Sequence, residues 1–119
     1  MILVDTSVWV EHFRFGHATL RKALDESLVL MHPFVIGELA CGGLKHRTEV
    51  LANLATLPTA QTAQHNEVLR LVSDHKLWGK GIGWIHAHLL ASAFLSNCRL
   101  WTFDRQLNGI ARTLQLARS

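Results

Sequence analysis

The chain opens with the run Met1-Ile2-Leu3-Val4-Asp5-Thr6-Ser7, in which an apolar stretch stops at an aspartate. A second run of the same kind, Leu100-Trp101-Thr102-Phe103-Asp104, stands near the other end. Each run predicts a short strand of a parallel sheet, because strands buried on both faces are continuously apolar. Ligands of such sheets bind at the carboxyl ends of the strands. We therefore expect Asp5 and Asp104 to meet above one crevice, where they would form a cation site.

Between these runs, short apolar stretches alternate with segments that have helical periodicity and helix-capping residues. We expect helices from Thr6, around 20–24, over 33–40, 48–57, 64–77 and 84–96 and after Asp104, and strands over 2–4, 28–31, 59–62, 100–103 and 114–117. This alternation predicts an α/β/α sandwich with a mainly parallel central sheet. A length of 119 residues, 49% of them hydrophobic, suits a single domain over 1–119.

Composition indicates where the protein is located and which kinds of partner it could bind. Apolar stretches are interrupted well before the roughly 20 residues that a bilayer span needs, and a strand follows Met1 directly, without a basic leader. We therefore expect a cytoplasmic protein that makes no membrane contact. Cys41 and Cys98 share no metal-binding spacing and are expected to be buried thiols. The formal net charge of +3 is compatible with a polyanionic partner, although the basic residues are scattered.

Three carboxylates carry the chemistry that we predict. Asp5 and Asp104 end strands, and Glu38 lies on a helix in apolar surroundings, where an unpaired carboxylate is unusual. Clustered carboxylates are stable only around a cation, and oxygen ligands suit Mg²⁺ or Mn²⁺. The chemical use of such a site is phosphodiester hydrolysis. Three simpler roles stay open: Asp5 and Asp104 could cap the helices that follow them, and Glu38 could pair with an arginine.

Four stretches together resemble a known family, the PIN-domain ribonucleases, and within it the VapC toxins of bacterial VapBC toxin–antitoxin modules. They are the opening run 2–9, the helix of Glu38, the segment 81–93 and the run 100–107. The resemblance implies a PIN fold and a Mg²⁺- or Mn²⁺-dependent endoribonuclease that cuts structured or single-stranded RNA. It also implies inhibition by a small VapB antitoxin, which itself binds operator DNA. Homodimers and toxin–antitoxin assemblies are expected for the same reason.

Carried over by position, the resemblance makes Asp5, Glu38 and Asp104 catalytic and metal-binding residues. It places a further acidic residue where this chain has His86, which is the fourth residue that we expect around the cation. Neutral imidazole brings no charge and suits Mg²⁺ poorly. Three explanations stay open: a natural shift of metal preference, a natural loss of catalysis with partner binding retained, and a substitution acquired because the active toxin harms its expression host. His88 is expected on a different face of the same helix.

Other residues have weaker assignments. The hydroxyls of Thr6, Ser7 and Thr102 are candidates for positioning a water molecule or a neighbouring carboxylate. Gly79 to Gly83 are expected to form a flexible turn, whose Lys80 could touch an RNA phosphate. Further candidates for backbone contacts are Lys45, His46, Arg47, Lys76 and Arg105. Phe13, Phe15, Phe34 and Val35 could form a groove for an amphipathic segment of the antitoxin.

Two alternatives from other classes of protein accompany the ribonuclease interpretation. The first is a catalytically silent protein that keeps the fold and binds RNA or antitoxin. The second is a receiver-like signalling domain, in which Asp5 or Asp104 would accept a phosphoryl group. A receiver would carry adjacent acids after its first strand and a lysine after its last, whereas Thr6 and Ser7 follow Asp5 and the chain has no lysine beyond Lys80.

Overall fold

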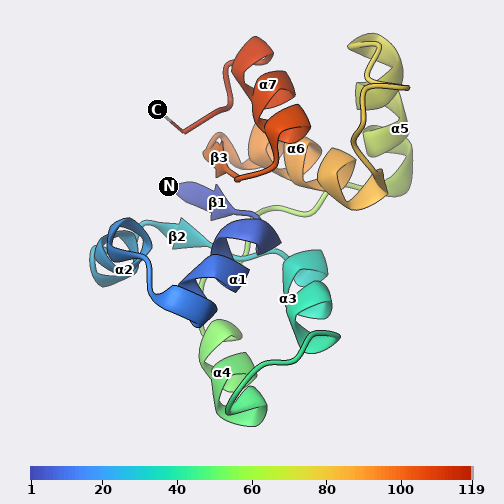
Figure 1. Ribbon diagram of the computed structural model, residues 1–119. Helices are drawn as coiled ribbons and strands as arrows, with labels where there is room; N and C mark the ends of the chain where they lie inside the picture. Colours follow the sequence, from blue (N-terminus) through green and yellow to red (C-terminus); the bar gives the residue numbers. More distant parts are fainter. Residues whose placement is uncertain (119) are drawn as a thin grey trace.

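Three short parallel strands run through the centre of the fold, in a computed structural model that describes residues 1–118. β1 (Ile2–Val4) lies in the middle, with β2 (Val29–Leu30) on one side and β3 (Arg99–Trp101) on the other (Figure 1). Val4 pairs with Trp101 in the register of β1 and β3. The two strands therefore end side by side, which brings the residues that follow them to the same edge of the sheet.

Helices surround the sheet on the side of β2 and on the side of β3. Within residues 1–118 they are α1 (Thr6–Phe15), α2 (Ala18–Asp25), α3 (Pro33–Ala40), α4 (Arg47–Leu54), α5 (His65–Asp74), α6 (Trp84–Ser96) and α7 (Arg105–Thr113). α1 to α4 lie on the β2 side in Figure 1, and α5 to α7 lie on the β3 side. The alternating elements and the parallel sheet confirm the predicted α/β/α architecture.

The core explains why these runs of sequence form strands and why α6 lies inside the molecule. Leu3, Val4 and Leu100 are completely buried, as continuously apolar strands in a covered sheet should be. In α6, residues 87–93 are all buried, so this helix is enclosed rather than amphipathic. α6 packs on β3 and on α5. Its first turn, which is less buried, carries His86.

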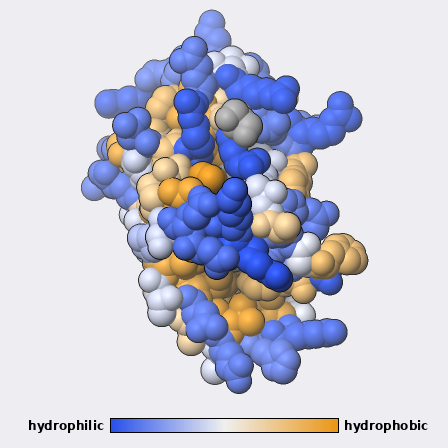
Figure 2. Space-filling view, turned by 90° about the vertical axis from the view of Figure 1, so that its left-hand side faces the viewer, coloured by the Kyte–Doolittle hydropathy of each residue, from blue (hydrophilic) through white to orange (hydrophobic). Residues whose placement is uncertain are grey.

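On the face turned toward the viewer in Figure 2, which includes α2, hydrophilic side chains cover most of the surface. Apolar surface appears there as small areas between them. In residues 1–118, none of the helices is both long enough and apolar enough to cross a bilayer. Cys98 is buried as predicted, whereas Cys41 is exposed, because it lies just beyond the end of α3.

The strands predicted over 59–62 and 114–117 are wrong, because each segment forms only a single β-bridge. Thr59 pairs with Met31, and Ala117 pairs with Leu100. In both segments, nearby backbone amides donate to groups outside the sheet, so the hydrogen bonds of a β-ladder do not continue. The Gln61 amide donates to the Ser96 hydroxyl at 2.8 Å. The Ala117 amide donates to the carbonyl of Ala111 at 3.2 Å.

α5 ends three residues earlier than its predicted limit, and the structure shows what stops it. Lys76 has a φ of 53°, in the left-handed region that ends many helices. The Leu77 amide then donates to the carbonyl of Val72, and the Lys76 amide donates to that of Ser73, at 2.9 and 3.3 Å. Leu77 is buried in the core. These contacts fix the direction in which the chain leaves α5 toward the glycine-containing loop.

Candidate active site

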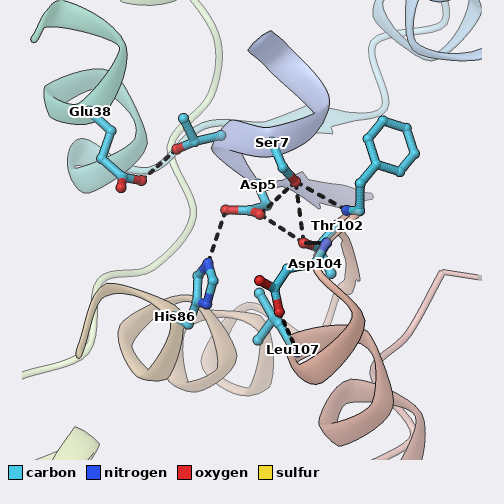
Figure 3. A network of polar contacts seen from close by, with 9 residues as sticks. Asp5, Ser7, Glu38, His86, Thr102, Asp104 and Leu107 are labelled. Atoms are coloured by element: carbon cyan, nitrogen blue, oxygen red, sulfur yellow. Dashed lines mark hydrogen bonds and ion pairs between the residues drawn. The ribbon is translucent and has the colours of Figure 1, made fainter. Parts of the chain in front are cut away.

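Asp5 directly follows β1 and is almost completely buried, with 2% of its surface exposed. It occupies the N-cap position of α1, yet its side chain accepts no hydrogen bond from the amides of that helix. Its Oδ2 atom instead accepts hydrogen bonds from the hydroxyls of Ser7, at 2.8 Å, and Thr102, at 2.7 Å (Figure 3). The simpler role of a capping side chain is therefore wrong for Asp5.

The same two hydroxyls also hold the loop that carries Asp104. The Phe103 amide donates to Ser7 Oγ at 3.0 Å, and the Asp104 amide donates to Thr102 Oγ1 at 3.0 Å. These bonds take residues 102–104 out of the sheet, so β3 ends at Trp101, two residues before its predicted end. Each hydroxyl thus connects Asp5 to the loop after the neighbouring strand.

The second carboxylate oxygen of Asp5 has no such support. Asp5 Oδ1 is buried and has no hydrogen-bond partner. The Nε2 atom of His86 lies 3.8 Å away, which is too long for a hydrogen bond. A buried carboxylate oxygen that lacks a donor or a cation destabilises the protein. This atom therefore marks a place where a positive partner would stabilise the structure.

Asp104 has a structural role on one of its oxygens and faces the crevice with the other. Asp104 Oδ1 accepts a hydrogen bond of 2.9 Å from the Leu107 amide and so caps α7. The predicted capping role is confirmed for this residue. In Figure 3 the other oxygen of Asp104 points toward Asp5 and His86. Asp5 and Asp104 thus lie at the same edge of the sheet, as expected from the ends of β1 and β3, and their part in a cation site stays a prediction.

Glu38 lies beside the crevice, on α3, but is held by Thr6. Its Oε1 atom accepts a hydrogen bond of 2.6 Å from the Thr6 hydroxyl. Apart from Asp5 with His86, no carboxylate in residues 1–118 lies within 4.0 Å of a basic side chain. The predicted pairing of Glu38 with an arginine is therefore wrong.

His86 is in the first turn of α6 and its side chain is 26% exposed. His88 is buried and packs between the rings of Phe34 and Trp84, at centroid distances of 4.6 and 4.8 Å. The two histidines thus have different surroundings, as their spacing predicts. Among the described residues, no three His, Cys, Asp or Glu side chains come close enough together to hold one metal ion. Asp5, Asp104 and His86 face one another, and Glu38 stands apart from them.

A further residue, His32, connects the helix of Glu38 to the helix of His86. It is 1% exposed. Its Nδ1 accepts a hydrogen bond from the Phe34 amide at 3.0 Å, so Nε2 carries the proton that it donates to Ser92 Oγ at 3.1 Å. Burial, and to a smaller extent His88, lower the pKa of His32 to about 4. Sequence reasoning missed this residue, although a polar side chain directly before Pro33 is typical of a helix N-cap.

A parallel α/β fold with aspartates at the ends of neighbouring strands, and a glutamate on the helix after the second strand, defines the class of PIN domains. The model of the PIN domain family matches residues 2–113, and the chain belongs to this family. Two proteins named Ribonuclease VapC32, from the Mycobacterium tuberculosis strains CDC 1551 / Oshkosh and H37Rv, are each 49% identical to it over 108 residues. The alignments cover 90% of this chain and 87% of each relative.

The fold also matches a solved structure. The crystal structure of PAE2754 from Pyrobaculum aerophilum superposes with a TM-score of 0.62 over 95% of this chain and 85% of that one. At 19% sequence identity, this likeness concerns the fold alone. The family membership contradicts the receiver-like alternative, and it confirms the resemblance to VapC-type PIN ribonucleases.

Proposed function

We propose that this protein is the toxin of a VapBC-type toxin–antitoxin module and that it hydrolyses RNA as a divalent-metal-dependent endoribonuclease. The observation that carries the proposal is the difference between the two oxygens of Asp5: two hydroxyls donate to Oδ2, whereas Oδ1 is buried without a donor, 3.8 Å from Nε2 of His86. The 49% identity to ribonucleases named VapC32 supports the choice of RNA as substrate. RNA as substrate also favours a cytoplasmic location, and we assign residues 1–119 to one domain.

Asp5 and Asp104 are the residues that we expect to hold Mg²⁺ or Mn²⁺, with Glu38 and His86 completing the site. The donor set fits the group, because carboxylate oxygens suit these ions and Asp5 Oδ1 lacks any other positive partner. A bound ion of this kind activates water for attack and stabilises the charge that develops on the phosphate. The Thr6 hydroxyl occupies only Oε1 of Glu38, so the second oxygen of this carboxylate is left for an ion.

The residues of the chain then have separate tasks. Ser7 and Thr102 act as positioning residues, because they fix the rotamer of Asp5 and the loop of Asp104 together. Asp104 supplies its free oxygen to the crevice while its other oxygen anchors α7. His86 lies 3.8 Å from Asp5 and can donate a proton or bind an ion through Nε2. Unlike an acidic residue, it contributes no negative charge to the site.

Position 86 decides the metal preference that we propose. Because imidazole suits Mn²⁺ better than Mg²⁺, we expect cleavage that is weak with Mg²⁺ and stronger with Mn²⁺. His86→Asp should restore cleavage with Mg²⁺. The test is RNA cleavage by both proteins with Mg²⁺, with Mn²⁺ and with chelator, and Asp5→Asn serves as the inactive control. If neither protein cuts RNA with either ion, the endoribonuclease proposal is wrong.

The absence of three converging ligands among residues 1–118 favours one alternative, a catalytically silent protein that binds RNA or antitoxin. Isothermal titration with Mn²⁺ separates the two candidates. A dissociation constant that weakens at least tenfold in Asp104→Asn supports the metal enzyme. Binding of RNA or antitoxin together with no measurable uptake of Mn²⁺ supports the silent protein.

We further propose a VapB-type antitoxin as protein partner, with contact to operator DNA only through that antitoxin. A groove of about 690 Å³ beside Glu38 is lined by Phe13 and Phe15, which expose 37% and 80% of their surface. An amphipathic segment could bury both rings there. Phe34 is also exposed, whereas Val35 is fully buried and belongs to the core, so its predicted place in a groove is wrong. Homodimers and larger toxin–antitoxin assemblies remain part of this proposal.

A further inference from the structure

A second groove, outside the cluster of carboxylates, lies between α7 and the loop that joins α5 to α6. Its volume is about 310 Å³. The loop lines it with His75 and Lys80, and α7 lines it with Arg105, Gly109 and Thr113 among others. Its ionisable lining residues are all basic, and no carboxylate lines it. The groove is therefore suited to an anionic ligand.

The groove begins next to the active site. Arg105 directly follows Asp104, which faces the crevice. At the same end, a Cβ atom on Gly81 would lie only 3.0 Å from the Gln106 side chain, so the loop packs tightly against the first turn of α7. From there the lining residues follow one face of α7, which has nine residues and is about 13 Å long. One end of the groove therefore lies at Arg105, the residue that follows Asp104 in the chain.

The basic groups of the groove are available to such a ligand. Lys80 and Arg105 are both exposed, and within residues 1–118 neither has a carboxylate within 4.0 Å. Two positions before Lys80, the same loop carries Trp78, which exposes 63% of its surface. Basic groups that follow a backbone, combined with an exposed aromatic ring, are the features by which proteins bind single-stranded nucleic acid. A simple anion would make no use of the exposed ring.

We propose that this groove binds the single-stranded RNA that continues from the bond to be cleaved. Lys80 and Arg105 each contact a backbone phosphate, and the indole of Trp78 stacks on a base. The proposal rests on the proposed ribonuclease function. The physical reason for such a groove is electrostatic. The carboxylates of the crevice repel the phosphates of the substrate, and the positive side chains of the groove offset this repulsion.

The test measures binding of a labelled single-stranded RNA in chelator, so that no cleavage takes place, over a range of salt concentrations. Each phosphate contact contributes about 0.7 to the slope of log K against log salt for a single strand. The double variant Lys80→Gln/Arg105→Gln should therefore bind with a slope that is less steep by about 1.4. Trp78→Ala should weaken binding at least about fivefold and leave the slope unchanged.

The matched control is Arg21→Gln/Lys22→Gln, which removes the same charge from exposed positions on α2, far from α7 in Figure 1. It should leave the slope close to that of the unmodified protein. Lys80→Arg/Arg105→Lys keeps both charges and should also keep the slope. Melting curves of all variants check the fold.

Two results overturn the proposal, and they differ in what they say of the function. If the double variant has the same slope and affinity as the control on α2, the groove does not hold the strand, and RNA cleavage by the unmodified protein would still support the ribonuclease. If the unmodified protein neither binds nor cleaves RNA, with Mg²⁺ or with Mn²⁺, the groove and the ribonuclease function both fail.

Discussion

The hydroxyl of Thr102 donates a buried hydrogen bond of 2.7 Å to the carboxylate of Asp5, across 97 positions of sequence. This bond determines which oxygen of Asp5 is held and which one faces the crevice. It also joins the end of β1 to the end of β3 through side chains, one residue beyond the last backbone pair of the two strands. The geometry of the proposed metal site therefore depends on residues that are not themselves ligands.

Thr102→Val tests that dependence with little change in shape. Valine removes the donor to Asp5 and the acceptor of the Asp104 amide, so we expect a loss of about 1–3 kcal/mol in the free energy of unfolding. Metal-dependent cleavage should fall about 10–100-fold, which is typical when the support of a ligand is lost. Urea denaturation and single-turnover cleavage measure the two effects. Thr56→Val, which removes an exposed hydroxyl just beyond the end of α4, should change neither quantity appreciably.

Asp5→Asn should separate stability from activity. In chelator, the variant removes a buried charge whose Oδ1 atom has no donor, so we expect a free energy of unfolding about 1–3 kcal/mol higher than that of the unmodified protein. Mn²⁺ should raise the melting temperature of the unmodified protein and not that of the variant, because binding to the folded state stabilises it. Asp25→Asn, at an exposed position, is the control. A variant that is less stable in chelator would contradict the account of Asp5.

His32 predicts how stability depends on pH. Burial lowers its pKa from 6.5 to about 4, so in acid the unfolded chain takes up a proton before the folded one does. Neutral His32 contributes about 3 kcal/mol to the free energy of unfolding above pH 6.5. This contribution is lost as the pH falls from 6.5 toward 4. Burial also lowers the pKa of His12 and of His88, which acts in the same direction.

Urea denaturation between pH 7.5 and 4 measures this loss. His32→Asn keeps a capping side chain before α3 and should reduce the pH dependence. His75→Gln changes an exposed histidine and should leave the pH dependence as it is. Equal pH dependence in the two variants would show that His32 is not the group responsible.

Because α6 is enclosed, truncating a buried leucine of this helix should cost more stability than truncating an exposed one. Leu90 is completely buried, and Leu90→Ala should lower the free energy of unfolding by about 2–5 kcal/mol. Leu95 is 38% exposed on the same helix, and Leu95→Ala should cost less than about 1.5 kcal/mol. Thermal or urea unfolding compares them directly. Similar losses would mean that α6 is not packed as described.

The parts of the fold that follow from local pattern were predictable from the sequence. The apolar runs that end in Asp5 and Asp104 give two neighbouring strands, because such runs fit a sheet covered on both faces. The edge strands over 59–62 and 114–117 were not predictable correctly. The amides of Gln61 and Ala117 donate to Ser96 and Ala111 instead of to a neighbouring strand, and hydropathy contains no information about such bonds.

For the site, the sequence indicates residue types but not their partners. It predicted the carboxylates and suggested hydroxyls as positioning groups. Which hydroxyl serves which carboxylate depends on rotamers, so the bonds of Thr6 to Glu38 and of Thr102 to Asp5 could not be foreseen. The place of His86 followed only from the resemblance to a family. Its 3.8 Å contact with Asp5 agrees with that place.

The bond between Thr102 and Asp5 also sets an order in time. Chains emerge from the ribosome beginning with the N-terminus, so Asp5 appears long before the residue that orients it. The crevice has both of its walls only after β3 and the start of α7 have been made and have paired with β1. A nascent chain that stops before β3 therefore lacks the proposed metal site, which forms only when the chain is nearly complete.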